Sequence, residues 1–278
     1  RQMHEDLHVR DMVSWSALLA AYAQEGQGHE ALNCFVQMQK EGFAPNEVTF
    51  SSILKACGSI GDIDNGKRIH SEIESRGLLQ KHVFLGTALV DMYAKFGFLP
   101  KAHEVLEELP IRDKFSWNAL IAGYAEEGHS NKVLECLEQM QRENLSPDDV
   151  TFLSILNACS RTGKSAEAQL YYETMSTKYG IIPKVEHHTC MVVVFGSSGY
   201  FDKAMSVIES IPSSDYVSIW LALLDACRRW GNVSLGKLVF NELVQLDNRC
   251  SPSYVLMADL FAMTGMTEDA YKINAMRL

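Results

Sequence analysis

The residues best suited to acid–base or metal chemistry do not complete a catalytic pattern in this sequence. His70 and Glu72 have the H-x-E spacing of zinc deaminases, but the P-C-x-x-C segment that supplies the other ligands is missing. His187 and His188 are adjacent, so a helix would direct them to different sides, and no third ligand is apparent. We therefore expect no metal, no cofactor and no catalytic residue.

The seven cysteines also favour packing over chemistry. Their number is odd and no C-x-x-C pair occurs, which argues against a disulfide framework or zinc ribbon and favours a reducing compartment. Cys57, Cys159 and Cys227 each follow an alanine at equivalent places, where a buried thiol packs as a small apolar group. The sequence also lacks the G-x-x-x-x-G-K-S/T, H-E-x-x-H and G-x-S-x-G motifs.

The composition indicates an ordered, soluble protein with a large core. Of 278 residues, 47% are hydrophobic and 22% are charged, and no apolar run approaches the ~20 residues of a membrane span. The net charge of −10 argues against indiscriminate nucleic-acid binding, because Lys and Arg supply most non-specific affinity for phosphates, but a local basic stripe is compatible with it. The first eleven residues carry acids and no apolar segment, so they do not form a targeting peptide.

The chain contains an internal repeat with an offset of 102 residues. Four separate stretches keep this register without a slip. They are Trp15 and Trp117, V-T-F at 48–50 and 150–152, I-L-K-A-C at 53–57 and I-L-N-A-C at 155–159, and L-P at 109–110 and I-P at 211–212.

Each block divides into three helix-pair patterns of 35, 36 and 31 residues. The second block illustrates the pattern, with Ser116 as the predicted N-cap of one helix and Gly128 as its end. An amphipathic helix follows, and Pro147 cannot continue it. Its expected buried face consists of Val133, Leu134, Leu137 and Met140. Repeating helix pairs of this length predict an all-α fold, an α-solenoid of stacked helix-turn-helix repeats.

The 35–36–31 cycle resembles the PLS class of plant pentatricopeptide repeat (PPR) proteins, over nearly the whole chain. The segments that carry the resemblance are S-W-N-A-L-I-A-G-Y-A-E-E-G, T-F-S-S-I-L-K-A-C-G-S-I-G-D-I-D-N-G-K-R-I-H-S-E-I and G-T-A-L-V-D-M-Y-A-K-F-G-F-L-P-K-A-H-E-V-L-E-E-L-P-I-R-D. The resemblance implies P motifs at 12–46 and 114–148, L motifs at 47–82 and 149–184, S motifs at 83–113 and 185–215, the tail of an earlier S motif at 1–11, an E1 motif at 216–249 and a truncated E2 motif at 250–278. It also implies a right-handed superhelix.

Proteins of this family bind single-stranded RNA with one base per repeat. The resemblance implies that the fifth and last residues of each motif recognise the base and that the second residue packs on it. The implied base-recognition pairs are Ser16 with Asn46 for adenine, Thr87 with Asp113 for guanine, Asn118 with Asp148 for uracil, and Thr189 with Asp215 for guanine. The implied packing residues are Val13, Val48, Phe84, Phe115 and Val150.

Three motifs depart from this pattern. The L motifs carry Ser51 with His82 and Leu153 with Lys184, which are not normal recognition pairs, so we expect little discrimination there. Glu186 replaces the apolar packing residue of the last S motif. The hypothetical RNA register is therefore 5′-A-n-G-U-n-(G)-3′.

The chemistry of the polar pairs agrees with this assignment. A carboxylate only accepts hydrogen bonds, which suits the ring N–H of uracil or guanine, whereas Asn can also donate to the bare ring nitrogen of adenine or cytosine. An isolated Asn or Asp at a helix end is usually a cap, but its recurrence in matching positions favours base recognition. Trp15, Trp117, Tyr22 and Tyr124 are expected in the core.

The resemblance finally implies a site-recognition factor for C-to-U editing of mitochondrial or chloroplast transcripts. The chain would not be an enzyme, since it lacks the deaminase-like DYW domain, and a deaminase would act in trans. Multiple organellar RNA editing factor proteins would bind at the L motifs. A protein-interaction scaffold of the tetratricopeptide type, which the acidic charge favours, and a PPR factor in RNA processing or stability are the alternatives.

Overall fold

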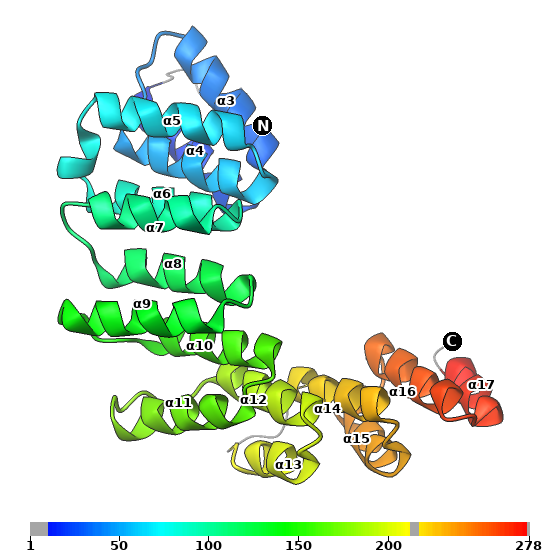
Figure 1. Ribbon diagram of the computed structural model, residues 1–278. Coiled ribbons are helices and arrows are strands. Elements are labelled where there is room, and N and C mark those ends of the chain that lie inside the picture. Colours follow the sequence, from blue (N-terminus) through cyan, green and yellow to red (C-terminus); the bar gives the residue numbers. More distant parts are fainter. Residues whose placement is uncertain (1–10, 212–216, 277–278) are drawn as a thin grey trace. The chain divides into compact units, whose positions relative to one another are not determined.

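The computed structural model describes residues 11–211 and 217–276, which form α-helices α2 to α17, one short 3-10 helix and no strand. The helices come in consecutive pairs (Figure 1). The first helices of the pairs are α2 Met12–Gln24, α4 Glu47–Ile60, α6 Val83–Lys95, α8 Lys114–Glu126, α10 Asp149–Thr162, α12 Val185–Ser197, α14 Val217–Trp230 and α16 Ser251–Met263. The second helices are α3 Gly28–Lys40, α5 Ile63–Ser75, α7 Leu99–Glu108, α9 Ser130–Arg142, α11 Ser165–Thr177, α13 Phe201–Glu209, α15 Val233–Leu246 and α17 Thr267–Met276, with the 3-10 helix at Leu78–Gln80.

The chain divides into two compact units, Arg1–Ser146 and Pro147–Leu278. Within the first unit, each of α2, α4 and α6 packs against the next first helix along the chain. Within the second unit, α10, α12 and α14 do the same, and α16 is the last first helix. The first helices therefore form a continuous inner layer in each unit, and the second helices pack onto it, which confirms the predicted stack of helix pairs.

The amphipathic faces of the helices explain this arrangement. Val133, Leu137 and Met140 are buried on α9 as expected, while Leu134 is half-buried and Cys136 joins the buried face. The first helices are buried on a wider face because they touch neighbours on both sides. Their fully buried side chains include Leu19, Phe50, Ile53, Leu54, Leu85, Leu89, Met92, Leu120, Ile121, Phe152 and Ile155.

A glycine ends each first helix in the part of the chain that the structure describes. These glycines adopt a positive φ between 66° and 79°, which a residue without a Cβ adopts freely. They are Gly26, Gly61, Gly97, Gly128, Gly163, Gly199, Gly231 and Gly265. The N–H that follows each glycine bonds a carbonyl five residues earlier, as in His129 N to Tyr124 O at 2.8 Å. Gly128 is therefore the helix end that the sequence predicted.

The predicted N-cap of α8 is wrong. Asp113, not Ser116, precedes the helix, and its Oδ1 accepts a hydrogen bond of 2.8 Å from the Ser116 N–H. Ser116 is the third helical residue, and its hydroxyl donates to the Asp113 carbonyl oxygen at 2.8 Å. Both residues are good capping residues, and the sequence pattern placed the helix start three residues too late.

Most of the expected core aromatics are confirmed. Trp15, Trp117 and Tyr124 are buried, and the hydroxyl of Tyr124 lies 3.4 Å from His103 Nδ1 on the preceding helix pair. Tyr22 is only half-buried. The reason is that no earlier helix pair covers α2 within the described residues.

The cysteines are free thiols, and all except Cys190 are buried. Burial raises the pKa of Cys57 and Cys227 to about 12 and that of Cys159 to about 11. Burial at these three equivalent positions agrees with the apolar packing role predicted for them. Among the described residues, no helix has both the length and the apolar character needed to cross a bilayer.

The turn glycines give the first testable prediction. Gly61→Ala should lower the free energy of unfolding by about 1–2 kcal/mol, because φ of +73° is unfavourable for any residue with a Cβ. Gly58→Ala, three residues earlier inside α4, is the matched control. Its new Cβ would lie 3.3 Å from Cδ of the flexible Lys95 side chain and at an ordinary contact distance of 3.5 Å from Met92 Cα. Alanine also gains up to about 1 kcal/mol of helix propensity. Urea unfolding followed by circular dichroism compares the two variants, and an equal loss in both would contradict the turn argument.

Candidate nucleic-acid interface

Apolar side chains are exposed at the second residue of five successive first helices. The exposed fractions are 74% for Val13, 44% for Val48, 44% for Phe84, 59% for Phe115 and 49% for Val150. Single exposed apolar residues are common on protein surfaces, but exposure at the same position of each repeat is a regular pattern. Glu186 occupies this position in α12 and is also exposed. The five apolar residues are those that the family resemblance assigned to base packing, and that role stays a prediction.

The fifth residue lies one helical turn further on, on the same face as the second, because residues three apart are neighbours on a helix. Ser16 and Asn118 are 7% exposed, and Thr87 and Thr189 are half-buried. The Thr189 hydroxyl donates to the Val185 carbonyl oxygen at 2.8 Å. The Thr87 hydroxyl is buried and has no hydrogen-bond partner in the described part of the chain. Such a group costs free energy until a partner reaches it.

The last residue of a motif is the N-cap of the next first helix. Asn46 Oδ1 accepts from Thr49 N–H at 2.8 Å, Asp113 Oδ1 from Ser116 N–H at 2.8 Å, and Asp148 Oδ1 from Thr151 N–H at 3.1 Å. Asp11 caps α2 in the same way, and hydrogen bonds from Ser14 hold the pKa of Asp11 below its ordinary value. Each of these Asn and Asp side chains is therefore a helix N-cap, as is usual for these residue types at a helix end.

Capping does not use up the hydrogen-bonding capacity of these side chains. In Asp113 only Oδ1 takes part in the cap, and a carboxylate has a second oxygen that can accept from a ligand. In Asn46 the cap uses the carbonyl oxygen of the amide and leaves its NH₂ group as a donor. One side chain can therefore start a helix and bind a base at the same time.

The structure brings one predicted base-recognition pair together directly. Ser16 Oγ lies 3.5 Å from Asn46 Oδ1, and both atoms contact a third residue, Thr49. Thr49 Oγ1 donates to Asn46 Oδ1 at 2.8 Å and lies 3.3 Å from Ser16 Oγ. The sequence analysis missed Thr49, although the N-x-x-T spacing of a cap followed by a hydroxyl residue could have indicated it.

The other three predicted base-recognition pairs differ from this first one. Thr87 and Asp113 belong to the same unit but make no hydrogen bond to each other, since the Thr87 hydroxyl has no partner in the described residues. Asn118 and Asp148 fall in different units, so their pairing stays a prediction. Asp215 lies outside the described residues, and so do residues 1–10 of the predicted N-terminal tail.

The last residues of the two predicted L motifs, His82 and Lys184, do not cap the next helix with their side chains and contact other residues instead. Lys184 forms an ion pair with Asp149, and the hydrogen bond from Lys184 holds the pKa of Asp149 below its ordinary value. His187 is nearly fully buried, donates from Nε2 to the Asp149 carbonyl oxygen at 2.9 Å and accepts from Lys184 N–H at 3.1 Å. His82 provides no side-chain cap, and its ring contacts Phe84 with 5.8 Å between centroids.

Two further histidines, His70 and His188, connect successive helix pairs. His70 Nδ1 lies 2.9 Å from the Tyr93 hydroxyl, and burial lowers the pKa of His70. His188 Nδ1 lies 2.7 Å from the Tyr172 hydroxyl, and burial lowers the pKa of His188 and raises that of Tyr172 to about 12. In the residues that the structure describes, no group of three or more His, Cys, Asp and Glu side chains could hold a metal ion.

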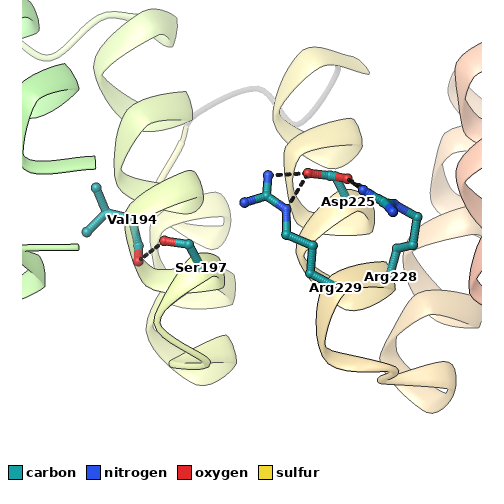
Figure 2. A network of polar contacts seen from close by, with 5 residues as sticks. All are labelled: Val194, Ser197, Asp225, Arg228 and Arg229. Atoms are coloured by element: carbon teal, nitrogen blue, oxygen red, sulfur yellow. Dashed lines mark hydrogen bonds and ion pairs between the residues drawn. The ribbon is translucent and has the colours of Figure 1, made fainter. Parts of the chain in front are cut away.

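The arginines near the end of α14 are engaged in ion pairs within that helix. Figure 2 shows Arg228 and Arg229 converging on Asp225, with Arg228 Nη2 at 2.7 Å from Oδ1 and Arg229 Nε at 2.8 Å from Oδ2. Burial alone would raise the pKa of Asp225, but hydrogen bonds from both arginines keep it below its ordinary value. This basic segment therefore carries its own acidic partner.

The fold and the repeated cap and surface positions define a helical-repeat protein of the α-solenoid class. Two models of one repeat family match it. The model described as "PPR repeat family" matches residues 10–59 and 112–161, and the model described as "PPR repeat" matches 48–78, 87–112, 150–178 and 186–216. Together the matches extend over more than half of the chain, and the chain belongs to the pentatricopeptide repeat family.

Relatives of the chain are found in Arabidopsis thaliana. The chain is 36% identical over 281 residues to a pentatricopeptide repeat-containing protein, covering 99% of this chain and 56% of that protein. It is 37% identical over 268 residues to the chloroplastic pentatricopeptide repeat-containing protein CRR2, covering 96% of this chain and 41% of that protein. A mitochondrial pentatricopeptide repeat-containing protein is 33% identical over 273 residues, covering 98% of this chain and 45% of that protein. The chain thus spans between 41% and 56% of the length of these relatives.

Solved structures share the fold at low sequence identity. The chain aligns with PPR10 from maize with a TM-score of 0.59 and 21% identity, covering 99% of this chain and 40% of that one. It aligns with PPR10 in complex with an 18-nt psaJ RNA element with a TM-score of 0.61 and 18% identity. This alignment covers 99% of this chain and 46% of that one. These likenesses confirm the α-solenoid fold.

The cap geometry gives the second prediction. Asp113→Ala should lower the free energy of unfolding by about 1 kcal/mol, because the Ser116 N–H loses its acceptor at the start of α8. Asp113→Asn should remain close to the original protein, since the amide oxygen can accept the same bond. Thermal unfolding of both variants measures the difference, and equal stability of the alanine and asparagine variants would show that this side chain does not cap.

Proposed function

We propose that this chain binds single-stranded RNA in a sequence-specific manner, with one base recognised by each repeat. The base-recognition pairs would be Ser16 with Asn46, Thr87 with Asp113, Asn118 with Asp148, and Thr189 with Asp215. The packing residues would be Val13, Val48, Phe84, Phe115 and Val150.

The regular exposure of the packing residues is the observation that carries this proposal. An apolar side chain lies at the second residue of five first helices, and a polar side chain follows one turn later on the same face. A base needs both features, a flat apolar contact for its ring and hydrogen-bonding groups for its edge. Stacking on an aromatic side chain contributes about 1–3 kcal/mol per base, so Phe84 and Phe115 should contribute more than the valines.

We further propose that the chain belongs to the PLS class, with P motifs at 12–46 and 114–148, L motifs at 47–82 and 149–184, S motifs at 83–113 and 185–215, and E1 and E2 motifs at 216–249 and 250–278. The engagement of Lys184 with Asp149 and the lack of a side-chain cap from His82 support weak discrimination by the L motifs. The proposed register is 5′-A-n-G-U-n-(G)-3′.

Within a longer protein, such a chain would serve as the site-recognition factor for C-to-U editing of an organelle transcript. A DYW-type deaminase would act in trans, and multiple organellar RNA editing factor proteins would bind at the L motifs. Relatives are named chloroplastic or mitochondrial, which supports an organellar location. A role in RNA processing or stability would use the same interface with a different partner.

The competing proposal is a protein-interaction scaffold of the tetratricopeptide type, which the net charge of −10 favours. The two proposals separate in a filter-binding experiment with short single-stranded RNAs. RNAs that carry A-n-G-U should bind more tightly than RNAs with these bases permuted, because stacking and edge contacts depend on the base. Equal binding of every RNA, or binding of none, would support the scaffold.

The uracil assignment gives the third prediction. Asp148→Asn should shift the preference of the motif 114–148 from uracil toward cytosine, because an amide can donate to the bare ring nitrogen that a carboxylate cannot serve. The contrast should lie on the scale of about 1–3 kcal/mol. Preferences at neighbouring registers act as the internal control, and an unchanged uracil preference would reject the assignment.

A further inference from the structure

We propose that Thr49 sets the base preference of the motif 12–46 by fixing the hydrogen-bond polarity of Ser16 and Asn46. Thr49 is the third residue of α4, so it belongs to the following motif, and it is neither a recognition nor a packing position. Its side chain is fully buried at 0% exposure and contacts both members of the pair. This inference rests on the proposed RNA-binding function.

The orientation of the Asn46 amide follows from its bonds to Thr49. The backbone N–H of Thr49 and its hydroxyl each lie 2.8 Å from Asn46 Oδ1. A backbone N–H can only donate, so the atom that faces it must be the amide oxygen and not the nitrogen. The NH₂ group of Asn46 is therefore the part of the amide left for a ligand, and it presents a donor.

The orientation of the Ser16 hydroxyl follows in turn. Thr49 has one hydroxyl proton, and that proton is donated to Asn46 Oδ1. In the 3.3 Å contact between Ser16 and Thr49, Ser16 must then be the donor. Its other contact, with Asn46 Oδ1 at 3.5 Å, also requires Ser16 to donate. The Ser16 proton points into the cluster in both cases, so Ser16 offers a ligand only its lone pairs.

A donor beside an acceptor selects one class of base. Adenine presents a bare ring nitrogen and an amino group, so it matches the donor of Asn46 and the acceptor of Ser16. Cytosine presents the same order on a smaller ring. Guanine and uracil present a ring N–H and a carbonyl oxygen, which reverses the order and leaves like groups facing each other. The cluster therefore selects bases with an amino group and rejects bases with a keto group at that edge.

In the motif 83–113, the residue equivalent to Thr49 does not connect the side chains of the two predicted recognition residues. Ser116 is the third residue of α8, but its hydroxyl donates to the backbone carbonyl of Asp113 at 2.8 Å and not to the carboxylate. The Thr87 hydroxyl of that motif has no hydrogen-bond partner in the described residues. Ser116 thus provides a matched control at the equivalent place in the fold.

Thr49→Val is the informative substitution. Valine keeps the shape of the buried side chain and the backbone N–H that caps with Asn46, but it removes the hydroxyl. Ser16 would retain only the 3.5 Å contact to Asn46, which is longer than an ordinary O–H···O bond of about 2.5–3.0 Å. Its proton becomes free to turn toward a ligand, so the motif should lose part of its discrimination against keto bases.

The experiment measures dissociation constants of the full chain for single-stranded RNAs that differ only at the base recognised by 12–46. Adenosine, cytidine, guanosine, uridine and inosine are placed there, since inosine has the adenine ring system with a keto edge. The original chain should bind adenosine about tenfold more tightly than inosine. Thr49→Val should reduce this ratio about three- to tenfold, Thr49→Ser should restore it, and Ser116→Ala should leave it unchanged.

Each outcome decides a separate question. If the original chain does not discriminate among RNAs at any register, the proposed function fails and this inference fails with it. If it discriminates but binds inosine as well as adenosine, the polarity assigned to Ser16 and Asn46 is wrong, and this result needs no variant. If Thr49→Val keeps the original ratio, or weakens binding to all bases equally, Thr49 has only a structural role and RNA recognition stands without it.

Discussion

The start of each first helix is the constraint on which the proposed recognition surface depends. The first N–H groups of a helix have no partner inside it, and in four repeats the last residue of the preceding segment provides one. Asp11, Asn46, Asp113 and Asp148 place a side-chain oxygen 2.8–3.1 Å from the N–H of the third helical residue. One bond thus fixes the end of a loop, the beginning of a helix and the position of a polar group on the surface. Because few side chains cap well, the same bond limits which residues can be used for recognition.

The fifth residue is limited by a different condition, namely burial. Ser16 is 7% exposed and satisfies its hydroxyl within the cluster of Asn46 and Thr49. The Thr87 hydroxyl is buried without a partner in the described residues, and such a group costs about 1–3 kcal/mol. A ligand that supplies this hydrogen bond would remove that cost. In the proposed interface the two sites would therefore differ in kind, since one is organised before binding and the other would gain its missing bond from the ligand.

The sequence was sufficient to predict the helix pairs and the glycine turns, because the 102-residue repeat samples each of these features twice. The packing positions at the second residues came from the family resemblance and not from the repeat. It was insufficient where one residue type has two roles. The sequence predicts Ser116 as the N-cap because serine caps well, but Asp113 also caps well and stands three residues earlier. Thr49 and His187 were missed because each acts on a neighbouring motif, and motif patterns do not contain contacts between motifs. The half-burial of Tyr22 depends on which helices precede it, which no local pattern records.

The charge of the chain limits which parts of an RNA the proposed interface could use. With a net charge of −10, attraction to the phosphate backbone is weak. Several cations are also held by nearby acids, as in Lys95 with Asp91, Lys101 with Glu104 and Arg228 with Asp225. In the proposed function, affinity for RNA would therefore come mainly from stacking and from hydrogen bonds to base edges, and both depend on the identity of the base. An acidic repeat protein of this kind loses little binding to non-specific competitors, so a modest affinity per repeat is compatible with high selectivity over several repeats.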